Sequence, residues 1–382
     1  MTLALNHPHP DRSPGPISSG RDGAEGPDHR SSGRPQLTNR AVEDRQIPRP
    51  YWPRNDKGTE AMPLKYAFYP GCVARGGTPE LYDSAVAVMK RLGIEWVELT
   101  RASCTGAGVM QEKNLKLGDT LNVRTFAMAE QLGLPILVLC STCQGVMSQA
   151  NARVQRDPGY LKEINGYLKD EGLEYKGTTV VKHLLWALLE DVGLEKLKAT
   201  FTRELAGLNV APFYGCYIVR PSDVLGFGEN PQRQTSLETV ITATGAKVTD
   251  FPGKNKCCGL PILYINQQNA LKMVADHTGT AQSLGADAMV TPCPLCHLNL
   301  DGFQPKARRK YSPLPTGEGE GEGTNRNAPT SLNGDTLPIL HLPQLIALAM
   351  GFAPKEIGLQ KHMVNTDGLA KKIVAGVAAS TR

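Results

Sequence analysis

The nine cysteines of this chain fall into two sets that follow one pattern. In each set a single Cys stands after a Gly, a further Cys follows after a gap, and a Cys-x-x-Cys closes the set. One position differs, because the second set has Cys257-Cys258 where the first set has Ser103-Cys104. The chain therefore contains two copies of one thiol-rich unit, and the first copy has one thiol fewer. The first set is Cys72, Cys104, Cys140 and Cys143, and the second is Cys216, Cys257, Cys258, Cys293 and Cys296.

Metal binding explains these thiols better than disulfides do. The number of cysteines is odd, two Cys-x-x-Cys units occur, and the chain is long enough for an apolar core that needs no covalent staples. Thiolates are the ligands preferred by zinc and by iron–sulfur clusters. The second set has one thiol more than tetrahedral zinc uses, which favours iron–sulfur there. The first set fits a zinc ion or a 4Fe-4S cubane equally well.

Composition excludes some other classes of protein. The chain has 382 residues, of which 40% are hydrophobic and 21% charged, as expected for a globular protein with two domains. A net charge of +5 is modest, and no Lys/Arg run is interleaved with aromatic residues, so nucleic-acid binding is not expected. No apolar stretch approaches the roughly 20 residues of a membrane span. The first residues lack the apolar segment of a secretory signal, which favours a cytoplasmic location.

Hydrophobic periodicity predicts alternating strands and helices in both halves of the chain. Such alternation is typical of parallel sheets with crossover helices, so the predicted fold class is α/β with two similar units, each a small, mainly parallel sheet. The expected order in the first half is strand (64–72), helix (78–93), strand (94–99), helix (117–133) and strand (135–140). The second half repeats it with a strand (209–216), a helix and strand (236–252), a helix (268–286) and a strand (287–293). Two further similar helices are predicted over 180–193 and 339–351, and they include His183 and His341.

Low-complexity segments divide the chain into five parts. The first is rich in Pro, Gly, Ser and charged residues, and another is rich in Pro, Gly and Glu, so neither has apolar side chains to bury. The predicted parts are a disordered leader (1–61), a first repeat with Ser103 in place of Cys (62–207), a complete second repeat (208–311), a low-complexity insertion (312–336), and C-terminal helices that pack on the second repeat (337–382).

The cysteines are expected to converge at one edge of each sheet. Each follows a predicted strand, and the carboxyl ends of parallel strands meet at the same edge. Adjacent glycines such as Gly71 and Gly215 allow the backbone to approach a cluster closely. Helices that begin after the cysteines direct N–H groups and a positive dipole end at an anionic group. The sequence thus predicts one metal pocket in each half.

With these motifs, the chain resembles the B-type subunit of heterodisulfide reductase, whose cysteine-rich CCG domain is present twice. Besides the cysteines, the resemblance rests on YAFYPGCVARG, LPILVLCSTCQGVM, FYGCYIVRP, KCCGLP and TPCPLCHLNLD. It implies two pseudo-symmetric CCG repeats. It also implies that a complete five-cysteine set holds a noncubane 4Fe-4S cluster at which a disulfide is cleaved. Cys216, Cys257, Cys258, Cys293 and Cys296 match such a set, whereas the first repeat departs from it at Ser103 and is expected to hold a 4Fe-4S cluster or zinc through its four cysteines.

The function that the resemblance implies is that of a redox subunit in sulfur metabolism. It would be an oxidoreductase that reduces or oxidises a disulfide, or lipoate-bound sulfur, at the second-repeat cluster. The chain contains neither a dinucleotide-binding fingerprint nor a ferredoxin cysteine run. Electrons would therefore come from a ferredoxin-like C-type subunit and a flavin-bearing A-type subunit. Two alternatives are an electron-transfer subunit of a glycolate, lactate or glycerol-phosphate dehydrogenase, and a zinc-bound structural scaffold.

Overall fold

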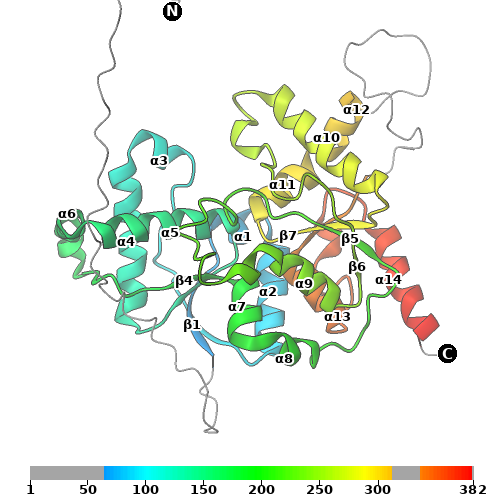
Figure 1. Cartoon of the computed structure of the whole chain (residues 1–382), viewed down its shortest axis with the longest axis horizontal. Helices are drawn as coiled ribbons and strands as arrows, with labels where there is room; N and C mark the ends of the chain where they lie inside the picture. The colour runs from blue at the N-terminus through cyan, green and yellow to red at the C-terminus, as the bar shows by residue number, and fades with distance from the viewer. Residues whose placement is uncertain (1–63, 312–335, 381–382) are drawn as a thin grey trace, which may run out of the picture. The chain divides into compact units, whose positions relative to one another are not determined.

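The computed structural model describes residues 64–311 and 336–380, all within one compact unit. The predicted leader (1–61) and all but the last residue of the predicted insertion (312–336) lie outside the described residues. Two four-stranded sheets form the centre of this unit (Figure 1), with strand orders β2-β1-β3-β4 and β6-β5-β7-β8. All the strand pairs are parallel, and the two sheets have the same topology. The predicted α/β class with two repeats is confirmed.

The elements alternate as the periodicity predicts. The first sheet and its helices consist of β1 (Lys65–Tyr69), α1 (Cys72–Gly76), α2 (Pro79–Arg91), β2 (Glu95–Glu98), α3 (Val109–Lys113), α4 (Leu115–Gln131), β3 (Ile136–Val138), α5 (Ser141–Arg156), α6 (Pro158–Leu168), β4 (Val181–His183), α7 (Leu184–Ala187) and α8 (Leu194–Lys198). The second consists of β5 (Asn209–Pro212), α9 (Ser236–Ala243), β6 (Lys247–Val248), α10 (Gln267–Ser283), β7 (Ala288–Thr291), α11 (Pro294–Gly302), α12 (Gln304–Tyr311), β8 (Ile339–His341), α13 (Leu342–Ala349) and α14 (Asp367–Ser380).

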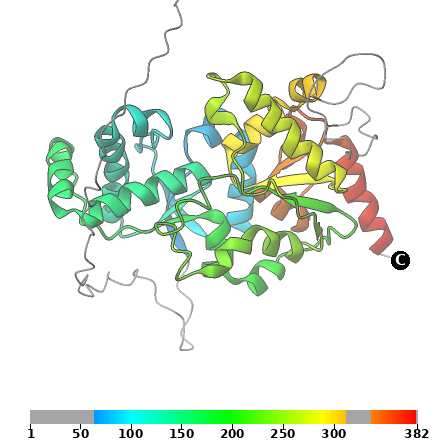
Figure 2. The same cartoon turned by 45° about the horizontal axis from the view of Figure 1, so that its top comes forward.

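Each sheet is covered by helices on both faces, because side chains alternate along a buried parallel strand. Tyr66 and Phe68 of β1 point into one apolar layer, together with residues of α2, α7, α9 and α13. Ala67 and Tyr69 point into the other layer, with residues of α4, α5, α10 and α11. Both layers contain residues of both repeats, so the repeats share a continuous core. Figure 2 shows helices on either side of the strands.

The repeats also exchange helix contacts. Helix α13, at the end of the second repeat, packs against α2 of the first, and α7 of the first repeat packs against α9 of the second. At the second contact, Arg233 forms an ion pair with Glu190 (Nε–Oε1 2.6 Å) and lies over the Trp186 ring, 4.3 Å from its centroid. The sequence did not predict that the last helices contact the first repeat.

The structure differs from the sequence prediction at His183 and His341. The predicted helices over 180–193 and 339–351 begin with three-residue strands, β4 and β8, and each histidine is the last residue of its strand. Each then serves as the N-cap residue of the helix that follows. These strands are too short for their period of two to be visible beside the strongly apolar helices. As a result, sequence analysis missed the fourth strand of each sheet.

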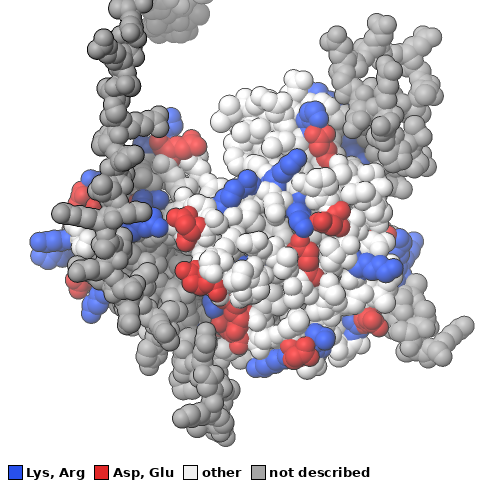
Figure 3. Space-filling view, viewed as in Figure 1, with Lys and Arg blue, Asp and Glu red and all other residues white. Residues whose placement is uncertain are grey.

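The surface offers no sign of a nucleic-acid-binding face on the side that Figure 3 shows. Acidic and basic side chains are interspersed there, without a continuous patch of either sign. Within residues 64–311 and 336–380, no helix combines the length and the apolar character that a membrane crossing requires.

Candidate metal centre

The cysteines lie at the carboxyl ends of the central strands. Cys72 opens α1 just after β1, and Cys140 and Cys293 are the N-cap residues of α5 and α11, directly after β3 and β7. In each sheet, β1 or β5 has one neighbour on either side, so the crossover direction reverses there. Ligand sites of open parallel sheets form at this reversal. The second cysteine of each Cys-x-x-Cys, Cys143 or Cys296, lies in the first helical turn, where free backbone N–H groups favour an anionic group.

The first set forms an open site. The Sγ atoms of Cys72 and Cys104 are 3.6 Å apart, and both residues are exposed, whereas Cys140 and Cys143 are buried. The Tyr69 ring lies close to the thiols of all four cysteines. Ser103 lines a surface pocket together with Cys72 and Cys104. The structure therefore brings the four predicted ligands and Ser103 to one place.

The second set also comes together, in a less exposed site. Cys257 contacts both Cys216 and Cys258, and the Cys296 thiol contacts those of Cys258 and Cys293. The backbone N–H of Gly259 donates to Cys257 Sγ over 3.4 Å. Cys258, Cys293 and Cys296 are buried, and the other two are partly exposed. All five predicted ligands thus surround one position.

Electrostatics indicates that these thiols need a cation beside them. Hydrogen bonds from Cys216 and then Cys258 lower the pKa of Cys257 to about 2, whereas the pKa of Cys216 is raised by its bond to Cys257 and by burial. In the first set, the hydrogen bond from Cys72 lowers the pKa of Cys104 to about 6 and leaves the pKa of Cys72 raised. One thiol of each pair therefore keeps its proton so that the other can ionise. Full ionisation requires a positively charged partner such as a metal ion.

Backbone geometry leaves room for such a group. Gly215 has φ +73°, and a Cβ at this position would lie 2.8 Å from Cys296 Sγ. Gly71, the equivalent residue of the first repeat, has φ +83°, and its Cβ would lie 3.6 Å from Cys143 Sγ. Only glycine adopts these conformations without strain and lets the chain pass this close to the sulfur. The thiol set and the glycines together fit an iron–sulfur group.

The two sites adjoin each other, which sequence analysis did not predict. The thiols of Cys140 and Cys293, the first cysteines of the two Cys-x-x-Cys units, contact each other across the boundary between the repeats. Thr142 Oγ1 lies 3.4 Å from Cys293 Sγ, and Ser141 donates to the Pro292 carbonyl over 3.2 Å. The expected two pockets are therefore neighbours within one centre.

Two residues that sequence analysis missed hold the ligand loops. The Tyr69 hydroxyl donates to the carbonyl of Ser103 over 2.8 Å, and His277 Nε2 lies 2.9 Å from the carbonyl of Cys257. Ser103 and Cys257 are equivalent positions, so different side chains make the same connection in the two repeats. The equivalent of Tyr69 is Phe213, whose ring packs against His277 at 5.2 Å between centroids. This Tyr-to-Phe difference was the available signal in the sequence.

Comparison with known proteins agrees with this arrangement. The cysteine-rich domain model named CCG matches residues 66–148 and 210–301. The B subunit of the ferredoxin/F420H2-dependent CoB-CoM heterodisulfide reductase of Methanosarcina acetivorans is 31% identical over 82% of this chain and 99% of its own length. The chain belongs to the family of heterodisulfide reductase B subunits. A protein of Archaeoglobus profundus that is named as similar to this B subunit is 29% identical over 77% of this chain and 93% of its own.

Another relative has a different role in its name. The 8-methylmenaquinol:fumarate reductase membrane anchor subunit of Wolinella succinogenes is 35% identical over 81% of this chain and 100% of its own. A solved structure of a hypothetical protein from Helicobacter pylori shares the fold, with a TM-score of 0.58 and 17% identity over 79% of this chain. The chain spans about half (52%) of that structure's length.

Family membership assigns a general role to this B-type chain. It is an iron–sulfur redox subunit that takes part in electron transfer as one component of an oxidoreductase complex. The predictions of iron–sulfur chemistry and of partner subunits are confirmed at this level.

Proposed function

We propose that the protein reduces or oxidises a disulfide, or a related sulfur compound such as a lipoate-bound one, at a noncubane 4Fe-4S cluster in its second repeat. The ligands are the five thiols of Cys216, Cys257, Cys258, Cys293 and Cys296. The observation that carries the proposal is that all five surround one position, where a tetrahedral ion would leave one without a role. When bound, such a cluster supplies electrons to a sulfur–sulfur bond or takes them from thiols. Reducing one disulfide consumes two electrons and two protons and gives two thiols.

The residues around this site position the ligands. Gly259 donates its N–H to Cys257 Sγ, and the side-chain amide of Asn299 donates to the carbonyl of Cys258 over 2.7 Å. His277 holds the carbonyl of Cys257. Adjacent cysteines in a glycine-flanked turn are thus fixed at both carbonyls, which keeps the two thiols directed at one group. Cys216 and Cys257 are the partly exposed ligands, and a substrate would approach from their side.

The first repeat has a different role in this proposal. Cys72, Cys104, Cys140 and Cys143 hold a 4Fe-4S cluster or a zinc ion, and Ser103 replaces the fifth thiol. Contact between Cys140 and Cys293 supports a short path between the two groups. Cys72 and Cys104 lie at the surface pocket, which supports entry of electrons there from a partner. A ferredoxin-like C-type subunit and a flavin-bearing A-type subunit fit this requirement. Reduced thiols of this kind suit the cytoplasm.

The test is a pair of matched substitutions in protein purified without oxygen. Cys257→Ala is expected to remove the cluster's EPR signal and disulfide turnover. The control, Ser103→Ala at the equivalent position, is expected to keep both. Retention of the signal and of turnover in Cys257→Ala contradicts the site assignment. Zinc without iron or sulfide in the wild type would identify a structural scaffold instead.

A second candidate is an electron-transfer subunit that does not act on sulfur compounds. The observation that favours it is the 35% identity to a subunit of a menaquinol:fumarate reductase. An electron-transfer subunit of a hydroxy-acid or glycerol-phosphate dehydrogenase belongs to the same group of roles. Disulfide turnover decides between the candidates. A protein with intact clusters that accepts electrons but turns over no disulfide, persulfide or dihydrolipoyl compound supports the second candidate.

A further inference from the structure

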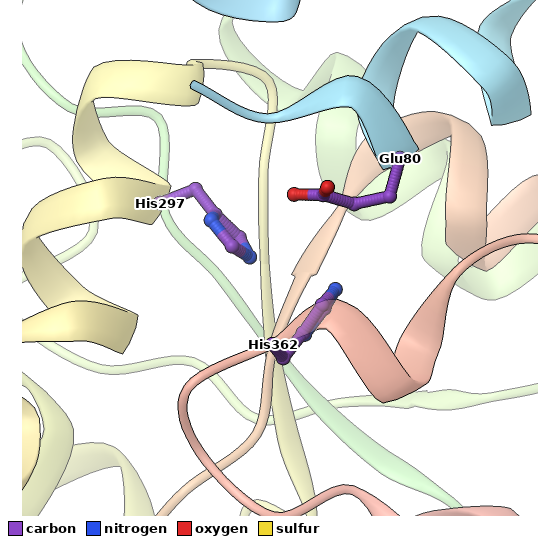
Figure 4. A group of neighbouring side chains, drawn as sticks. All are labelled: Glu80, His297 and His362. Carbon is purple, nitrogen blue, oxygen red and sulfur yellow. The ribbon is translucent and has the colours of Figure 1, made fainter. Parts of the chain in front are cut away.

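A buried group of side chains lies beside the second-repeat site but takes no part in it. Glu80 of α2, His297 of α11 and His362 of the C-terminal segment come from distant parts of the chain and turn toward one another (Figure 4). One donor atom from each side chain lies within 4.8 Å of the others. Glu80 and His297 are buried, with 4% and 2% exposure, and His362 is half-buried. Charged and polar groups of this kind are seldom buried together without a partner.

Neighbouring hydrogen bonds fix the orientation of His362. The Gln344 amide donates to the carbonyl of Ile357 over 2.9 Å, and its Oε1 accepts from the backbone N–H of His341. Gln344 Oε1 also lies 3.1 Å from His362 Nε2, which therefore carries the proton and donates it. The proton on Nε2 leaves a lone pair on His362 Nδ1, which has no hydrogen-bond partner. A histidine held in this way, by a bond from its other nitrogen, is oriented as metal-bound histidines are.

His297 is also without a partner. Neither of its ring nitrogens makes a hydrogen bond of normal geometry, although the ring is buried near the carbonyl of Ile339. Its ring stacks on that of His341, with 3.8 Å between centroids and 22° between planes. His341 in turn places Nε2 3.3 Å from Glu80 Oε1 and so directs the carboxylate. A buried nitrogen without a partner costs on the order of 1–3 kcal/mol, and a ligand on it would remove that cost.

The equivalent positions in the first repeat have no such group. Gln144 corresponds to His297 and donates to the carbonyl of Val181 over 3.0 Å. His183 corresponds to His341, and both of its nitrogens are engaged: Nε2 lies 2.9 Å from the carbonyl of Pro292, and Nδ1 accepts the N–H of Leu185. The unpartnered histidines are thus a feature of the second repeat, and packing of the shared fold does not require them.

We propose that Glu80, His297 and His362 bind one divalent metal ion of the zinc type. Two imidazoles and one carboxylate are a donor set that zinc uses, with bonds of about 2.0–2.2 Å. Such bonds place the donor atoms about 3.3 Å apart, so the side chains must close by about an ångström from their present limit. His341 and Gln344 are the outer residues that hold Glu80 and His362. The ion joins α2, α11 and the C-terminal segment one residue beyond Cys296, and it does not depend on the type of cluster that the cysteines bind.

Metal analysis of the full chain tests this site. Protein purified without oxygen, with its clusters in place, is mixed with Zn²⁺, freed of unbound metal by gel filtration, and assayed for zinc and iron. We expect the wild type to take up one zinc more than Glu80→Gln or His362→Gln, with equal iron in all three. The loss of affinity should exceed the roughly 10–100-fold that removal of an outer-shell partner causes. The matched control is His183→Gln, which alters the equivalent histidine and should bind zinc as the wild type does.

X-ray absorption at the zinc edge is the second measurement, and it needs only the wild type. The added zinc should show nitrogen and oxygen neighbours with an imidazole pattern. Equal zinc in the wild type and both variants, no zinc uptake by the wild type, or uptake accompanied by sulfur neighbours and loss of iron would each overturn the proposal. This readout also covers the case in which a variant fails to fold.

Discussion

The two repeats have the same strand order and the same positions for their cysteines, yet they build different sites. The second repeat gathers five thiols in a mostly buried site, whereas the first gathers four beside Ser103 and leaves Cys72 and Cys104 exposed. The loops are fixed at the same carbonyl in both, through Tyr69 in the first repeat and His277 in the second. The scaffold is thus maintained separately from the ligands. One copy can change its chemistry at a single position without a change in fold.

Exchange of the residues at the equivalent positions is the strongest way to break this comparison. Cys257→Ser should give the second repeat the ligand set of the first, and we expect complete loss of its cluster signal and of disulfide turnover. Ser103→Cys should do the reverse and add a signal of the second-repeat type. Iron and sulfide analysis with EPR measures both changes. An unchanged spectrum in Cys257→Ser would mean that the fifth thiol does not distinguish the sites.

Alanine at the two ligand-loop glycines sharpens the comparison of space. Both residues have a positive φ, so each substitution carries a backbone cost of about 1–3 kcal/mol. Gly215→Ala adds a Cβ at 2.8 Å from Cys296 Sγ, and Gly71→Ala adds one at an ordinary 3.6 Å from Cys143 Sγ. We therefore expect Gly215→Ala to lose more iron and to lower the thermal midpoint further. Equal losses would show that backbone strain alone decides the outcome.

Removal of the two loop-holding hydrogen bonds should have the smallest effect. Tyr69→Phe and His277→Phe each delete one bond to a ligand-loop carbonyl, and we expect each to cost about 1 kcal/mol of stability. Because the bonds are equivalent, the two thermal shifts should be similar. A much larger shift for His277→Phe would reveal a role beyond positioning, and a change in the second-repeat EPR signal would locate that role at Cys257.

Sequence analysis predicted the repeat, the fold class and the residues that converge. Each Cys-x-x-Cys follows an apolar run, and strand ends in a parallel sheet meet at one edge, so local pattern was sufficient for these. Contact between Cys140 and Cys293 depends on how the repeats face each other, which local pattern does not contain. Glu80, His297 and His362 were missed as a group because they are far apart in the chain, and a single buried histidine looks like any packed one. The short strands β4 and β8 were hidden by the helices that follow them.

The reciprocal contacts of α13 with α2 and of α7 with α9 also bear on how such a chain arises and how it can be divided. A duplicated gene whose product exchanges its last helices in this way encodes the equivalent of a dimer joined in one polypeptide. Neither half is self-sufficient: a fragment ending near residue 207 would leave α2 without α13, and the remaining fragment would leave α9 without α7. Expression of one repeat alone should therefore give an insoluble product. Evolution can alter either half, but it must keep both.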